Sequence, residues 1–195
     1  MMDTSTGLLC KLRVGDEADA WGRFMALYKP YLYGWLRRQS VQHADAEDLV
    51  QETLAVVIGQ VQDFQHNQRP GAFRNWLRTT LANRLRLFRR SEKVRSVAST
   101  NCDLLARLAE ALDKEAGPLV QTWDHDHDRY IARKFLEKIE PDFQPMTWLA
   151  FRRVVIQGCD PEQAAEELEI SLDSVYAAKS RILKRLRLEA EDLLD

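Results

Sequence analysis

The sequence has little that would suit a secreted or membrane protein. Only three cysteines occur in 195 residues, far apart and in no metal-binding or redox spacing, so we expect Cys10, Cys102 and Cys159 to be reduced thiols. The longest apolar run, Leu54–Ile58, is far too short to span a bilayer. The first 20 residues lack the apolar core of a signal peptide. These absences predict a soluble, cytoplasmic protein with no membrane-inserted segment.

Catalytic motifs are also missing. The sequence contains no nucleophile elbow, no glycine-rich phosphate loop and no HExxH pair of metal-binding histidines. The tract DHDHD at residues 124–128 offers possible metal ligands, but no cysteine or distant ligand accompanies it. A solvent-exposed polar tract is therefore the preferred interpretation. We expect neither an enzyme nor a bound metal or cofactor.

Strand-type alternation is nearly absent, and helical periodicity dominates. Apolar residues make up 45% and charged residues 30% of the chain, which is ordinary for a folded globular protein. Apolar stripes at i, i+3, i+4 and i+7 predict helices over Trp21–Arg38, Asp45–Val61 and Phe73–Arg95. Asp63–Phe73 contains Asn, Pro and Gly and is predicted to be a loop. Pro30 lacks a backbone donor and is expected to bend or divide its helix.

These patterns predict an all-α protein of two small helical domains joined by a linker. Residues 1–97 form an N-terminal helical bundle, and residues 98–128 form the linker, with a short helix around Asp103–Glu115. Residues 129–195 form a C-terminal four-helix domain with a helix-turn-helix, which is large enough to fold alone. Its helices are expected over Tyr130–Ile139, Met146–Gln157, Pro161–Leu168 and Leu172–Leu188.

The formal net charge of −2 hides a strong segregation of charge. Residues 44–63 contain five acids and no Lys or Arg, whereas residues 73–95 contain eight cations and one acid. Helices of opposite charge suggest surfaces for different partners. The acidic helix would repel DNA, so its outer side either meets solvent or binds a basic patch on a protein.

The segment Asp160–Arg187 has the pattern of a helix-turn-helix. Asp160 is expected to cap the first helix, with Pro161 at its first position and Gln163 completing a capping-box arrangement. Ser171 is expected to cap the second helix, whose cations would meet phosphates while its first turn faces base edges. The alternative is an amphipathic helix whose charges only meet solvent.

The turn of this motif holds Glu169 where glycine is usual. If the backbone there is left-handed, a residue with a Cβ costs on the order of 1 kcal/mol. Glu169 therefore predicts strain at this point of the turn.

The basic helix at residues 73–95 has two distinct sides. Leu77, Leu81 and Leu85 are expected to point inward together with Trp76. The side chains expected on the outer side are Arg74, Arg78, Asn83, Arg86, Arg89 and Arg90. Arginine rows neutralise phosphates and asparagine can hydrogen-bond to bases, so this helix is a second candidate for DNA binding. The alternative is a basic side that only meets solvent.

In this order, the segments resemble bacterial RNA polymerase sigma factors of the extracytoplasmic-function (ECF) group, which are sigma-70-like. The stretch DAEDLVQETLAVV at Asp45–Val57 resembles the family's helix that binds core polymerase. The stretch FRNWLRTTLANRLRLFRR at Phe73–Arg90 resembles the helices of region 2 that melt and read the −10 element. Trp148–Arg187 resembles region 4, which reads the −35 element. The resemblance implies a transcription initiation factor that directs core RNA polymerase to promoters.

The resemblance also assigns site residues and partners. Polymerase binding falls on Asp45, Asp48, Gln51 and Glu52. Contacts with the −10 element fall on Arg74, Trp76, Arg78, Asn83, Arg86 and Arg90, with Asn83 beside a pocket for a flipped base. Contacts with the −35 element fall on Ser171, Ser174, Ala177, Ala178, Lys179, Arg181, Lys184 and Arg185. The implied partners are promoter DNA, the largest-subunit coiled coil and flap region of core RNA polymerase, and an anti-sigma factor.

Two rival functions stay open at the level of sequence. A helix-turn-helix regulator would bind duplex DNA tightly without polymerase. A helical adaptor that does not bind DNA would tolerate reversal of Arg86, Arg181 and Lys184 to acids.

Overall fold

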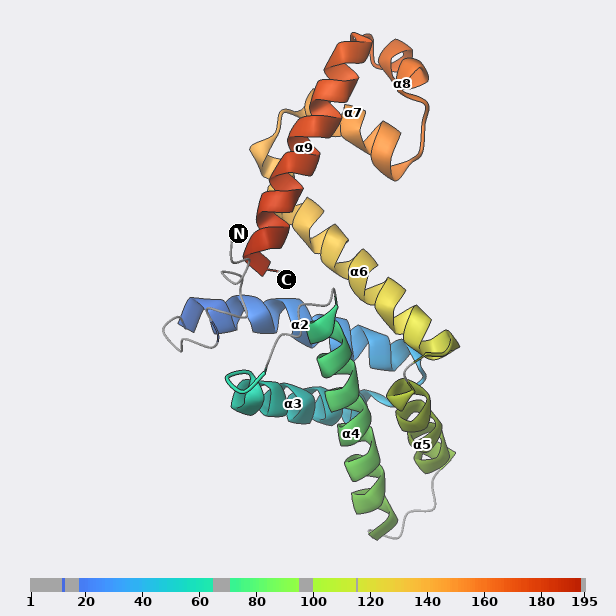
Figure 1. Cartoon of the computed structure of the whole chain (residues 1–195). Helices are drawn as coiled ribbons and strands as arrows, with labels where there is room; N and C mark the ends of the chain where they lie inside the picture. The colour runs from blue at the N-terminus through green and yellow to red at the C-terminus, as the bar shows by residue number, and fades with distance from the viewer. Residues whose placement is uncertain (1–11, 13–17, 65–70, 95–99, 115, 194–195) are drawn as a thin grey trace. The chain divides into compact units, whose positions relative to one another are not determined.

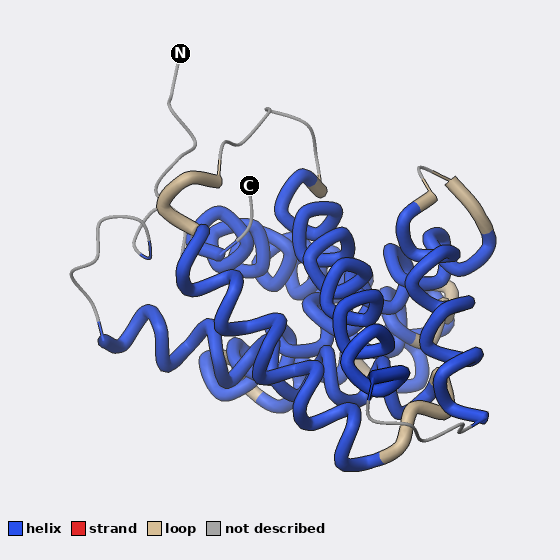
Figure 2. The backbone as a smooth tube through the Cα atoms, turned by 90° about the horizontal axis from the view of Figure 1, so that it is seen from below, coloured by secondary structure: helices blue, strands red, loops and turns tan. Residues whose placement is uncertain are grey.

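The computed structural model describes residues 12, 18–64, 71–94, 100–114 and 116–193. Within these ranges every regular element is helical and no strand occurs (Figures 1 and 2), which confirms the predicted all-α class. The chain divides into a first compact unit that ends at Ile131 and a second that begins at Ala132. Cys10, the side chain of Cys102 and residues 65–70 of the predicted loop lie outside the described part.

Three long helices frame the first unit: α2 (Ala18–Arg38), α3 (His43–Gln60) and α4 (Ala72–Val94). They occupy the positions predicted from their apolar stripes, and α2 continues through Pro30 rather than dividing there. Trp35 of α2, Leu49 of α3 and Leu81 of α4 are fully buried. The stripes therefore meet in a shared core, with α3 packed against both neighbours.

The segment predicted as a linker is largely helical: α5 spans Thr100–Asp113 and α6 spans Pro118–Ile139. α5 packs along α4. The indole of Trp123 on α6 is fully buried, with its ring centroid 4.9 Å from that of Trp35 and 5.3 Å from that of Tyr31 on α2. The structure therefore corrects the linker expected over residues 98–128, because α5 and the first part of α6 belong to the first unit. The roles assigned to the domains stay predictions.

The second unit contains the end of α6 followed by short helices and one long helix: η1 (Glu140–Asp142), α7 (Pro145–Phe151), η2 (Arg152–Ile156), α8 (Pro161–Glu167) and α9 (Leu172–Leu193). η2 is a π-helical turn that continues α7. Ile139, Trp148, Phe151 and Ile182 form the core of this unit. The long α9 is thus anchored by its apolar side.

α8 and α9 form the predicted helix-turn-helix. Asp160 caps α8 by accepting a hydrogen bond from the N–H of Glu162 at 2.9 Å, and Ser171 caps α9 by accepting one from the N–H of Ser174 at 3.2 Å. The amide of Gln163 donates to Glu167 instead of completing a capping box. Both predicted caps are confirmed, whereas the box is not.

Glu169 has a φ of 54°, which confirms the left-handed backbone expected in the turn. Its N–H donates to the carbonyl of Glu166, and the N–H of Ile170 donates to the carbonyl of Ala165. These two bonds form a Schellman ending, which satisfies carbonyls at the end of α8. The left-handed backbone at Glu169 and these two hydrogen bonds therefore set the path of the chain into α9.

Candidate polymerase and DNA interfaces

The predicted polymerase-binding residues lie on one side of α3. Asp48, Gln51 and Glu52 are exposed, and Asp45 is half-buried near the start of the helix. The opposite side is committed to the core through Leu49 and residues one turn away. The exposed side is polar and negatively charged, so it is complementary to a basic protein surface.

A cavity of about 370 Å³ lies beside this side of α3, against α2. Its lining is formed by Lys29, Pro30, Tyr33, Glu47, Val50 and Gln51. Gln51 therefore connects the acidic side of α3 to a concave surface of mixed polarity. A concave surface of this kind suits a side chain of a docked protein.

Arg78 is buried, so the outward position predicted for it on α4 is wrong. The residue is 5% exposed. Its Nη1 donates to the backbone carbonyl of Lys114 at 2.8 Å, and its Nη2 donates to the side chain of Asn75. Arg78 braces α4 against the end of α5, and we do not propose it as a DNA contact.

Arg74 is bound by acids of α6. Its Nε lies 2.9 Å from a carboxylate oxygen of Asp124, and its Nη1 pairs with Asp128. Arg38 of α2 forms a further ion pair with Asp126 at 3.1 Å. All three aspartates of the DHDHD tract are thus paired with arginines of the first unit. Asp128 stays exposed as predicted, whereas Asp124 and Asp126 are half-buried.

His127 of the same tract is buried against α2. Its Nε2 lies 3.4 Å from the hydroxyl of Tyr28, and its ring centroid lies 5.4 Å from that of Tyr31. Burial is the largest influence and lowers the pKa of His127, although its hydrogen bond with Asp128 acts in the opposite direction. A neutral imidazole in this place supports packing. Across the described residues, no three possible metal ligands come together.

The outer side of α4 keeps Asn83 and Arg90 exposed. Arg86 is half-buried; it donates to the amide oxygen of Asn83 at 2.9 Å and pairs with Asp113 of α5 at 2.6 Å. Trp76 is also half-buried, as a support for this side rather than an open contact. Of the predicted −10 residues, the structure brings Asn83, Arg86 and Arg90 together on one surface.

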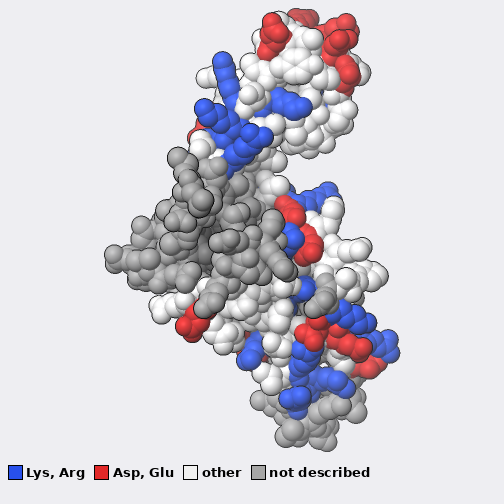
Figure 3. Space-filling view, viewed as in Figure 1, with Lys and Arg blue, Asp and Glu red and all other residues white. Residues whose placement is uncertain are grey.

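α9 presents most of the predicted −35 residues on its outer side. In the second unit, the basic side chains visible in Figure 3 gather along α9, whereas the acidic ones gather around α8. Ser171, Ser174, Arg181 and Lys184 are exposed, and Ala177 is half-buried. This pattern agrees with a helix that has one side available for a large partner.

Three predicted −35 residues have other surroundings. Ala178 is 4% exposed, because it lies one turn from both Val175 and Ile182 on the core side of α9, and we do not propose it as a DNA contact. Lys179 is half-buried. The third residue, Arg185, forms ion pairs with acidic side chains of its own unit.

Arg185 forms a small charge network within the second unit. Its Nε lies 3.2 Å from Asp142, and its Nη1 lies 2.8 Å from Glu189. Glu189 is buried and also binds Lys138 of α6. Arg185 therefore joins α9 to η1.

Sequence reasoning missed an apolar surface on α7 and η2. Met146, Leu149, Val155 and Ile156 are exposed large apolar side chains. The only sequence signal was a surplus of apolar residues over what one helical side needs. The π-helical turn of η2 changes the helical register there, so Val155 and Ile156 face away from the core.

Comparison with known proteins gives two matches. A family model for sigma-70 region 2 matches residues 24–95, which include most of α2 and all of α3 and α4. The chain is also 27% identical over 191 residues to the ECF RNA polymerase sigma factor SigE of Mycolicibacterium smegmatis (strain ATCC 700084 / mc(2)155), covering 95% of this chain and 68% of that protein. These two matches support an ECF sigma-70-like factor. No solved structure matches the chain.

The two matches support a sigma-factor role in transcription initiation. Neither match is to a catalytic family. The match to region 2 ends at residue 95, so α5 and α6 lie beyond it. In the part of the chain that the structure describes, no helix combines the length and the apolar character needed to cross a membrane.

Proposed function

We propose that this sigma factor binds core RNA polymerase through α3 and directs it to promoters by reading a −10 element with α4 and a −35 element with α9. One observation carries the proposal: an exposed acidic helix lies within the region 2 match, and exposed basic surfaces occur on one helix of each unit. Opposite surface charges in one chain fit a factor that joins a basic protein surface to DNA.

Docking on polymerase uses two surfaces in this proposal. Asp48, Gln51 and Glu52 bind the coiled coil of the largest subunit. The exposed large apolar residues of α7 and η2 bind the flap region, because burying apolar side chains against a partner is favourable: Met146, Leu149, Val155 and Ile156. An anti-sigma factor that covers either surface is a further candidate partner.

Promoter melting uses the outer side of α4. Asn83 lies beside the site of a base flipped out of the duplex, and Arg86 and Arg90 supply positive charge along it. Unstacking a base costs a few kcal/mol, which contacts with a pocket and a cationic surface offset. Arg74 and Arg78 position α4 instead of contacting DNA.

Duplex recognition uses the outer side of α9. Ser174, Ala177 and Arg181 contact base edges near the start of the helix, and Lys184 contacts phosphate. Each unit alone offers a small interface, so tight promoter binding needs polymerase to hold both units in place.

A pull-down with core polymerase followed by run-off transcription tests the proposal. The wild-type chain is expected to bind core polymerase and to add promoter-specific transcripts. Glu52→Lys is expected to lose both activities, whereas Glu140→Lys, an exposed acid of η1, keeps them. Tight binding of duplex DNA without polymerase would instead identify a helix-turn-helix regulator, and acid-reversed Arg86, Arg181 and Lys184 with full activity would identify an adaptor.

A further inference from the structure

We propose that Asp113 of α5 is a positioning residue for Asn83 of α4. Through Arg86, it holds the side-chain amide of Asn83 with Oδ1 turned toward Arg86 and Nδ2 turned away to donate. Asn83 then recognises a base by an acceptor atom on the base edge. This role rests on the proposed function, in which Asn83 lies beside the flipped base, and it belongs to a helix beyond the region 2 match.

Arg86 connects the two residues through its two terminal nitrogens. Its Nη1 donates to Oδ1 of Asn83 at 2.9 Å, and its Nη2 lies 2.6 Å from Oδ2 of Asp113. The guanidinium group is a planar, rigid fork, so the pairing of Nη2 with Asp113 also fixes the direction in which Nη1 donates. Asp113 therefore acts on Asn83 through Arg86.

The end of α5 is itself fixed against α4 by a second arginine. Arg78 is buried and donates from Nη1 to the backbone carbonyl of Lys114 at 2.8 Å, next in the chain to Asp113. On the other side of Asp113, Leu112 is fully buried. Asp113 is thus an exposed acid between two anchored residues, and its carboxylate has a defined place relative to α4.

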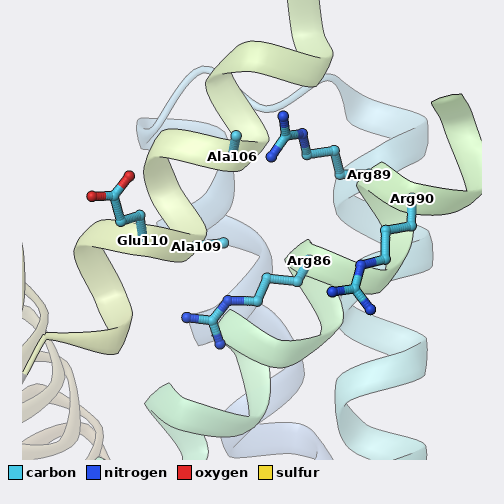
Figure 4. A pocket seen from close by; sticks show the side chains of 6 residues that line it. All are labelled: Arg86, Arg89, Arg90, Ala106, Ala109 and Glu110. Atoms are coloured by element: carbon cyan, nitrogen blue, oxygen red, sulfur yellow. The ribbon is translucent and has the colours of Figure 1, made fainter.

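Arg86 lies in a groove between α4 and α5. The groove is a cavity of about 370 Å³, lined by Arg86, Arg89, Arg90, Ala106, Ala109 and Glu110. Figure 4 shows the guanidinium group of Arg86 on the Ala109 side of the groove and that of Arg89 on the Ala106 side. The alanines leave room for the long arginine side chains because their own side chains are short. Glu110 also lines the groove, but the acid that pairs with Arg86 is Asp113.

The orientation of the Asn83 amide follows from the chemistry of its partner. A guanidinium group donates hydrogen bonds and accepts none, so only the oxygen of the amide can face Arg86. Without such a partner, the amide of an exposed asparagine turns over a broad range about χ2 and offers either its oxygen or its nitrogen. Asn83 is exposed, so its Nδ2 stays accessible. Held in this way, Asn83 favours a base atom that accepts a hydrogen bond.

The ion pair between Arg86 and Asp113 adds little to stability by itself. The two side chains are 35% and 47% exposed, and exposed ion pairs contribute little to the free energy of unfolding. Loss of Asp113 is therefore expected to change base recognition more than folding. This difference separates a positioning role from a purely structural one.

The test uses holoenzyme reconstituted from the full chain and core polymerase, with forked promoter fragments whose −10 region is single-stranded. Fluorescence anisotropy measures the affinity for fragments that carry each of the four bases at each position of that region. Asn83→Ala identifies the position at which Asn83 discriminates between bases. Asp113→Ala is expected to lower discrimination at that position by about three- to tenfold, which is what one hydrogen bond contributes, and to leave the other positions unchanged.

Glu110→Gln is the matched control, because Glu110 is an exposed acid of the same helix that lines the groove, while Arg86 pairs with Asp113 instead. It is expected to keep the wild-type discrimination. Asp113→Ala with wild-type discrimination overturns the proposal, as does an equal loss with Glu110→Gln. If Asp113→Ala does not fold, Arg86→Lys decides, because lysine has one nitrogen and cannot hold both partners in a fixed plane. Unchanged discrimination with Arg86→Lys then overturns the proposal.

Asn83→Asp tests the donor directly. A carboxylate has the shape of the amide but no N–H, so we expect the same loss of discrimination as with Asn83→Ala. Retained discrimination with Asn83→Asp shows that Nδ2 does not read the base and overturns the proposal. Wild-type holoenzyme whose discrimination Asn83→Ala leaves unchanged at every position contradicts the proposed function of Asn83 itself, which is a distinct outcome.

Discussion

The Nε atom of Arg74 on α4 lies 2.9 Å from a carboxylate oxygen of Asp124 on α6, so this chain binds one of its own candidate DNA-contacting side chains. Arg78 is bound in a similar way by a carbonyl at the end of α5. Helices α5 and α6 thus take up part of the basic side of α4. Asn83 and Arg90 remain exposed and define the surface left for DNA.

Arg78 and Arg90 should therefore differ in stability and in binding. Arg78→Met is expected to lower the free energy of unfolding by about 1–3 kcal/mol, because the carbonyl of Lys114 loses its buried donor. Arg90→Met is expected to change it by less than about 0.5 kcal/mol, because the side chain is exposed. Denaturant titration measures both. For promoter binding by the holoenzyme the order reverses: Arg90→Met weakens it, and a wild-type affinity for this variant would contradict the −10 surface.

Acid should destabilise the first unit through His127. Burial lowers its pKa below the usual 6.5, so the unfolded chain takes up a proton at higher pH than the folded one. The free energy of unfolding is therefore constant above about pH 6.5 as far as this group is concerned, and falls as pH drops from there toward the lowered pKa. The groups that face the imidazole are Tyr28, Tyr31, Arg74, Asp124 and Asp128.

Thermal melts at about pH 7.5 and about pH 5.5, on either side of the ordinary histidine range, check this. His127→Gln is expected to lose less stability on acidification than the wild-type chain. His125→Gln, which replaces the exposed histidine of the same tract, should keep the wild-type pH dependence. Identical dependence in all three chains would show that another group is responsible.

Ala177 and Ala178 are neighbours on α9 with opposite surroundings. Ala178→Leu is expected to lower the free energy of unfolding by about 1–3 kcal/mol, because it overpacks the core side of the helix. Ala177→Leu should leave stability nearly unchanged and should lower transcription from promoters that depend on a −35 element. Calorimetry and run-off transcription separate the two effects. Full transcription with Ala177→Leu would remove this position from the DNA surface.

Glu169→Gly should stabilise the turn between α8 and α9. Glycine adopts a positive φ without the Cβ clash, and the gain is expected to reach up to about 1 kcal/mol after its larger unfolded-state entropy is offset. Glu166→Gly, inside α8, is the control with the opposite sign and should cost about 0.5–1 kcal/mol. Equal losses of unfolding free energy in both variants would show that the left-handed backbone carries no strain.

The helices α2, α3 and α4 of the first unit and the helix-turn-helix were predictable, because the sequence features that indicate them are local. Leu49, Leu54 and Val57 repeat at helical spacing on α3, and the Asp160-Pro161 pair has the chemistry of a helix start. Such signals depend only on residues within a few helical turns of one another. They can therefore be recognised in the sequence without knowledge of the tertiary structure.

The packing of α6 was not predicted, although its spacing was present. Val120, Trp123, His127 and Ile131 follow one another at helical intervals on the buried side. His127 lies among aspartates, and a histidine in such a run is ordinarily solvated. Only the contact with Tyr28, 99 residues away, makes it part of a core.

The candidate site was predictable as a surface but not residue by residue. The basic composition of α4 predicts that the helix has a charged side. The burial of Arg78, however, depends on its hydrogen bond to the carbonyl of Lys114, 36 residues further along the chain. The groove beside Arg89 likewise depends on where α5 packs. Neither fact has a local sequence signal.

Transcription from total genomic DNA by core polymerase, with and without this sigma factor, tests the central claim most directly. Sequencing of the transcripts gives their start sites. We expect new start sites that share one −10 and one −35 element, and that disappear with Glu52→Lys while persisting with Glu140→Lys. The same set of start sites with and without the chain would contradict its assignment as a promoter-specificity factor.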